Sequence, residues 1–105
     1  MTTFDEREQR YEKKFALDEE QKFKAEARRN KLLGLWAAEK LGLSGDPALA
    51  YAREVVAAEF DESDGVVHKV VSDFAAQNIA LAEREVRAKL GQLMEQAAAQ
   101  VKAGA

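Results

Sequence analysis

The chain has 105 residues, of which 47% are hydrophobic, and this gives room for one domain with a core rich in alanine. It contains no cysteine, which excludes disulfides, thiol catalysis and cysteine-ligated zinc. A net charge of −3 gives no case for nucleic acid, and without a signal region or an apolar run of ~20 residues we expect a cytoplasmic protein that does not insert into a membrane.

The N-terminal part, residues 3–41, has no proline and one glycine, which predicts a single long helix. Its opening letters TFDE fit the capping box S/T-x-x-E. More than half of its first thirty residues are charged, yet Phe4, Tyr11 and Phe15 fall in one narrow stripe at 100° per residue. Such a helix would span about 60 Å, roughly twice the length of the later helices. Its first half therefore has little of its own protein to pack against.

We accordingly divide the chain into an N-terminal arm, residues 1–20, and a globular domain, residues 21–105. The arm could be helical or disordered when free, and the sequence leaves both open. Aromatic residues serve as anchors in protein interfaces, and basic residues add rim contacts. The predicted partner-binding residues are Phe4, Arg7, Arg10, Tyr11, Lys14 and Phe15. The alternative is that the aromatic stripe packs back on the domain.

The segment after residue 31 is apolar on most of its circumference, and Gly34 beside Trp36 favours a close helix approach. Gly42 and Gly45 predict its end. Asp46 then reads as an N-cap with Pro47 in the first helical position. The apolar stripe of this second helix is Leu49, Ala52, Val55, Val56 and Phe60, and a turn follows at 61–65.

A third helix is indicated by valines at a spacing of three to four residues, and it ends at Gln77 and Asn78. The fourth helix has Ala82 where a capping Ser or Thr is expected, and its apolar positions are Val86, Leu90, Leu93, Met94, Ala97 and Val101. The pattern predicts an all-α protein, a four-helix bundle with a charged N-terminal extension. The predicted core is Leu35, Trp36, Val56, Val71, Phe74, Leu90 and Leu93.

Residues that could carry chemistry are few. His68 is the only histidine and stands beside Lys69, which favours a surface position over a metal ligand or general base. The chain contains neither of the glycine-rich phosphate-binding motifs G-x-x-x-x-G-K-[ST] and G-x-G-x-x-G. We therefore expect no enzyme activity, no metal and no cofactor, and the sequence points to no cofactor-binding residues.

The block FKAEARRNKLLGLWAA at residues 23–38, followed by Lys40-Leu-Gly, resembles the ζ inhibitor subunit of bacterial F-type ATP synthases. The opening MTTFDERE and the Val86-Arg-Ala-Lys helix resemble it too, so the likeness runs from end to end. It implies a four-helix domain whose N-terminal segment, about residues 1–19, enters the catalytic α/β interface and obstructs rotation in the hydrolysis direction. The γ subunit is an additional candidate partner, and the resemblance also implies weak nucleotide binding. It further implies a monomer when free, peripheral to the inner membrane through ATP synthase.

Two other functions remain open at this point. A small-ligand or nucleotide-binding sensor would use the bundle as its pocket, so binding should survive deletion of residues 1–19. A generic coiled-coil adaptor is disfavoured, because the aromatic stripe does not continue as a sustained heptad.

Overall fold

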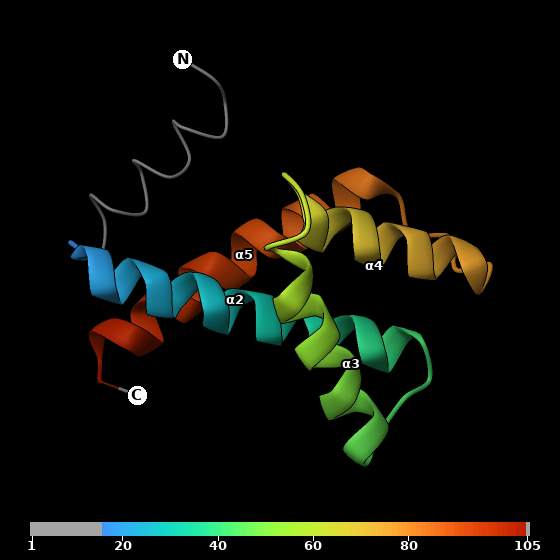
Figure 1. Cartoon of the computed structure of the whole chain (residues 1–105), viewed down its shortest axis with the longest axis horizontal. Coiled ribbons are helices and arrows are strands. Elements are labelled where there is room, and N and C mark those ends of the chain that lie inside the picture. Colours follow the sequence, from blue (N-terminus) through green and yellow to red (C-terminus); the bar gives the residue numbers. More distant parts are fainter. Residues whose placement is uncertain (1–15, 105) are drawn as a thin grey trace.

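The computed structural model describes residues 16–104, which fold into four helices (Figure 1). The helices are α2 (Glu19–Lys40), α3 (Gly45–Ala58), α4 (Gly65–Ala76) and α5 (Glu83–Lys102). The described part of the chain contains no strand, which confirms the all-α prediction. None of the helices between residues 16 and 104 is long and apolar enough to cross a membrane.

Helix α2 begins later than the sequence predicted. Asp18 is its N-cap: the carboxylate accepts from the backbone N–H of Gln21 at 2.8 Å, and the Gln21 side chain accepts from the Asp18 N–H at 3.2 Å. Residues 16–18 are not helical, and Ala16 has a φ of +49°. The prediction of one continuous helix over residues 3–41 is therefore wrong at 16–18. The capping box predicted at Thr3 lies outside the described residues.

Helix α2 is the centre of the fold, because α5 runs antiparallel along it and α3 crosses it (Figure 1). At the crossing, a Cβ added to Gly34 would lie 2.6 Å from the Cα of Ala52. Only a residue without a side chain allows this approach. The expectation that Gly34 permits close helix packing is confirmed.

Replacing Gly34 with alanine should therefore destabilise the fold by forcing α2 and α3 apart. Overpacking of this kind costs ~1–3 kcal/mol. The better helix propensity of alanine recovers at most ~1 kcal/mol. We expect a lower midpoint in thermal denaturation, whereas a raised midpoint would mean that the two helices separate freely.

The core lies where all four helices meet, and its fully buried side chains include Leu33, Val55, Val70, Phe74 and Val86. Among the predicted core residues, Phe74 and Leu93 are confirmed as buried. The others are only half-buried, which corrects the prediction: Leu35, Trp36, Val56, Val71 and Leu90.

Two residues of the predicted second-helix stripe are exposed. Phe60 has 75% of its surface exposed and Leu49 has 42%. The stripe was extended too far, because α3 ends at Ala58 and Phe60 already belongs to the turn.

The helix ends follow the predicted glycine and asparagine positions with one exception. Gly42 after α2 and Asn78 after α4 both have positive φ, at +80° and +58°. Helix α3, however, starts at Gly45 after Ser44, so the prediction of Asp46 as N-cap with Pro47 first in the helix is wrong. Proline is tolerated there because the first turn leaves its backbone N–H positions without partners inside the helix.

The start of α5 at Ala82 is confirmed, including the missing side-chain cap. Glu85 compensates in part, since its Oε2 accepts from the backbone N–H of Ala82 at 3.1 Å. This is half of a capping box, and it explains how a helix can begin at an alanine.

Candidate functional site

The predicted partner-binding residues fall outside the described part of the chain. These are Phe4, Arg7, Arg10, Tyr11, Lys14 and Phe15. The structure therefore shows where the arm is attached and leaves its contacts as a prediction.

The attachment point lies at the end of the bundle where α2 begins and α5 finishes (Figure 1). Lys102 Nζ donates to the carbonyl of Ala16 at 3.5 Å. Leu17 packs against a small apolar cluster that includes Ala25, Met94 and Ala97. The chain therefore contacts the bundle from Ala16 and Leu17 onward, before the predicted domain boundary at residue 21. The division into arm and domain itself stays a prediction.

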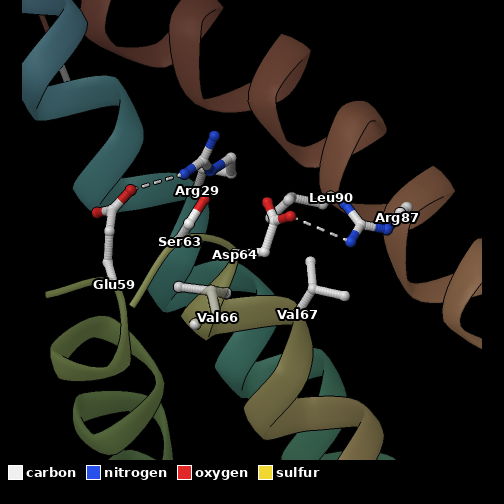
Figure 2. A pocket seen from close by; sticks show the side chains of 9 residues that line it. Arg29, Glu59, Ser63, Asp64, Val66, Val67, Arg87 and Leu90 are labelled. Carbon is white, nitrogen blue, oxygen red and sulfur yellow. Dashed lines mark hydrogen bonds and ion pairs between the residues drawn. The ribbon is translucent and has the colours of Figure 1, made fainter. Parts of the chain in front are cut away.

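A cavity of about 410 Å³ opens between α2, the α3–α4 turn and α5 (Figure 2). We name it the arginine pocket, since Arg29 enters it from α2 and Arg87 from α5. Its lining residues are Arg29, Glu59, Ser63, Asp64, Gly65, Val66, Val67, Arg87 and Leu90.

On the α2 side of the arginine pocket, Glu59 uses both carboxylate oxygens. Oε1 accepts from Nη2 of Arg29 at 3.1 Å, and Oε2 accepts from Nδ2 of Asn30 at 2.7 Å. Asn30 is fully buried, and its Oδ1 accepts from Nε of Arg29 at 3.0 Å. A buried amide needs such partners, because leaving one unpaired costs free energy. This network therefore locks the end of α3 onto α2.

On the α5 side, Arg87 is held by two carboxylates. Its Nη2 donates to Oδ2 of Asp64 and its Nε donates to Oε2 of Glu83, each at 3.3 Å. Burial lowers the pKa of Arg87, but the hydrogen bonds to Asp64 and Glu83 outweigh it and raise the pKa above its usual value. Each guanidinium of the pocket is thus already paired with a carboxylate. These pairs connect α2, the α3–α4 turn and α5, so the arginine pocket has a structural role.

Replacing Glu59 with alanine tests this assignment. The substitution removes the acceptor of the buried Asn30 amide, so we expect a loss of ~1–3 kcal/mol in the free energy of unfolding. Glu59→Gln keeps one acceptor oxygen and should lose less. Asp61→Ala, two residues further on and exposed, should be near neutral in urea denaturation. Equal effects of Glu59→Ala and Asp61→Ala would contradict a structural role for the network.

A second polar cluster joins α3 to α4. The Tyr51 hydroxyl donates to Oδ2 of Asp73 at 2.8 Å, and Lys69 Nζ lies 3.1 Å from the same oxygen. Lys69 also lies 3.7 Å from Glu54 and 5.1 Å from the centre of the Tyr51 ring. Burial, together with the nearby carboxylate of Asp73, raises the pKa of the Tyr51 hydroxyl. The phenol therefore stays protonated and acts as a donor that ties the two helices together.

The remaining candidate for chemistry, His68, is exposed, as predicted, and its Nδ1 lies 3.0 Å from Oε1 of Glu62. Within residues 16–104, no group of three or more His, Cys, Asp or Glu side chains is arranged to hold a metal ion.

One feature was missed by the sequence analysis, which singled out no binding residue in the domain. Phe23 has 65% of its surface exposed on the first half of α2. The only sequence signal for this is that Phe23 stands among charged residues, between Lys22 and Lys24.

A family model described as ATPase inhibitor subunit zeta matches residues 1–100. The match covers the predicted arm as well as the four helices almost to the end of α5. No curated protein matches the chain.

Proposed function

Because the chain belongs to the ATPase inhibitor subunit zeta family, we propose that it inhibits ATP hydrolysis by F-type ATP synthase through its N-terminal arm, residues 1–20. The arm inserts into the catalytic α/β interface, with the γ subunit as a further contact, and obstructs rotation. The observation that carries this proposal is the family match, which includes the arm and the bundle together. In this role the protein is non-catalytic and lies at the inner membrane through its partner.

Inhibition of this kind needs no chemistry. A ligand holds an enzyme in one rotational state only through its higher affinity for that state. Aromatic side chains supply such affinity, so Phe4, Tyr11 and Phe15 are the proposed anchors. Arg7, Arg10 and Lys14 add contacts at the rim and speed association.

The described domain supports the proposal by giving the arm a firm base. The Asp18 cap fixes the start of α2, and Leu17 is packed against α5. The arm is therefore joined to the folded bundle through residues that themselves contact α5. We propose that the bundle remains outside the interface and limits how far the arm enters.

The first experiment adds the full-length protein to purified F-type ATP synthase and measures ATP hydrolysis. We expect saturable inhibition. A parallel calorimetric titration with ATP or ADP tests the sensor function, which predicts nucleotide binding and no inhibition. Inhibition without an inserted arm would leave the inhibitor role intact and contradict the mechanism.

The second experiment locates the arm by cross-linking. Since the natural chain has no cysteine, a single introduced cysteine is the only thiol. Glu12→Cys carries a photo-cross-linker into the arm, and Arg84→Cys carries the same group on the exposed start of α5. Insertion predicts adducts with the α or β subunit from position 12. Adducts of equal yield from both positions, or from position 84 alone, would contradict insertion of the arm.

A further inference from the structure

The first half of α2 exposes an aromatic side chain that the bundle does not use. Phe23 is two positions from Ala25, and this places the two about 200° apart around the helix. Ala25 is fully buried in the cluster that joins α2 to α5, whereas Phe23 is 65% exposed. Single exposed apolar side chains are common on proteins, so the exposure of Phe23 gains meaning only from the groove that it lines.

Phe23 is also part of a groove, which we name the Phe23 groove. It encloses about 620 Å³ between α2, α3 and the end of α5. Its apolar lining comes from Ala27 on α2, Val56 on α3 and Val101 on α5. With Phe23, α2 contributes two apolar side chains and α3 and α5 one each, so the groove offers an apolar partner group a surface built from three helices.

The polar side of the Phe23 groove is basic. Lys24, Arg28 and Lys31 line it, and no acidic side chain from residues 16–104 does. Lys24 pairs with Glu20 at 3.1 Å, but both side chains are more than half exposed, so this ion pair exchanges readily. In a chain with a net charge of −3, three basic side chains around one apolar groove favour an acidic partner.

We propose that the Phe23 groove docks onto an acidic surface of ATP synthase beside the interface that receives the arm. This inference rests on the proposed function. The groove begins at Gln21, and Phe23 lies only five residues beyond Asp18, roughly 8 Å along a helix. An arm inserted in the enzyme therefore brings the groove to the rim of the same interface. Docking there adds a second contact that needs no further ordering, because α2 is already folded and capped.

The test uses the full-length protein and a matched pair of variants. Phe23→Ala and Phe60→Ala each remove an exposed phenylalanine, at 65% and 75% exposure, but only Phe23 lines the groove. Neither should change the thermal midpoint appreciably, since neither side chain is buried. We expect Phe23→Ala to weaken binding to ATP synthase by roughly tenfold or more, as for an aromatic hot spot, and Phe60→Ala to leave it within about twofold.

A second pair tests the basic rim. Lys31→Glu should slow association several-fold at low salt and less at high salt, because charges at the rim steer encounter. Arg84→Glu makes the same charge change on exposed α5, outside the groove, and should have the smaller effect. The rates are measured by surface plasmon resonance on immobilised enzyme.

Several outcomes would overturn the docking inference. If wild type inhibits but Phe23→Ala binds equally well, the groove is not a contact, and the proposed function stands. Tighter binding by Phe23→Ala would assign the groove to the chain's own arm, and self-association abolished by Phe23→Ala would assign it to a second copy. If wild type neither binds nor inhibits, the proposed function itself fails.

Discussion

Replacing Phe74 with alanine should lower the free energy of unfolding by ~3–5 kcal/mol, because the ring fills the centre of the core. Phe74 has no exposed surface, and its ring meets that of Trp36 edge to face, with centroids 5.8 Å apart. Leu33, Val55, Val70 and Phe74 belong to one buried cluster, so the cavity would be surrounded by α2, α3 and α4. Small domains are stable by about 5–15 kcal/mol, and this loss is a large share of the total.

The measurement is urea denaturation followed by circular dichroism, with two comparisons. Trp36→Ala should cost less than Phe74→Ala, because Trp36 is half-buried, with Lys40 and Lys89 ammonium groups about 6 Å from its ring. Phe60→Ala should cost almost nothing, since Phe60 is 75% exposed. A loss for Phe74→Ala no larger than that for Phe60→Ala would contradict the placement of the core.

Much of the architecture could be predicted because the chain marks its helix ends with local chemistry. Gly42 and Asn78 adopt positive φ after α2 and α4, as residues of these types do at helix ends. Ala82 was recognised as the start of α5 even without a capping side chain, because the apolar spacing after it is helical. Local signals of this kind act within one turn, so they can be recognised without knowing the tertiary structure.

The break at residues 16–18 was missed although its signal was present. Asp18 and Gln21 form a capping box of the kind D-x-x-Q. The surrounding residues all favour helix, so propensity alone extended the helix through this point. A capping box within a helical pattern can therefore mark the start of a new helix, even when no glycine or proline precedes it.

The burial errors have a tertiary cause. Leu33 is buried and Leu35 is not. Helix α3 crosses α2 at Gly34, where an added Cβ would lie 2.6 Å from the Cα of Ala52. This crossing determines which face of α2 is covered. The same crossing leaves Phe23 outside the core and brings Val56 beside it in the groove. Which face of an apolar segment is buried depends on the crossing partner, and the segment's own sequence does not contain that information. The Phe23 groove could therefore not be predicted from the sequence, and the aromatic stripe of the arm stays a prediction.

Replacing Phe4, Tyr11 and Phe15 together with alanine should abolish inhibition of ATP hydrolysis while leaving stability nearly unchanged. On a helix, at 100° per residue, the three residues would share one face, and they belong to the segment that the family match includes. Loss of a single aromatic hot spot costs ~2 kcal/mol or more, which is about 30-fold in affinity. Three such losses should raise the dissociation constant above every concentration at which the wild-type protein saturates the enzyme.

The control changes the opposite face of the same arm. On a helix, Glu6, Gln9 and Lys13 would lie about 140° to 180° from the centre of the aromatic stripe, so their triple alanine variant should keep most of the inhibition. Hydrolysis is measured over a range of inhibitor concentrations, with the thermal midpoint of each variant as a check on folding. Undiminished inhibition by the aromatic variant would remove these side chains as anchors. Equal losses in both variants would mean that the arm acts through its charge or its helical form, because the two faces would then be interchangeable.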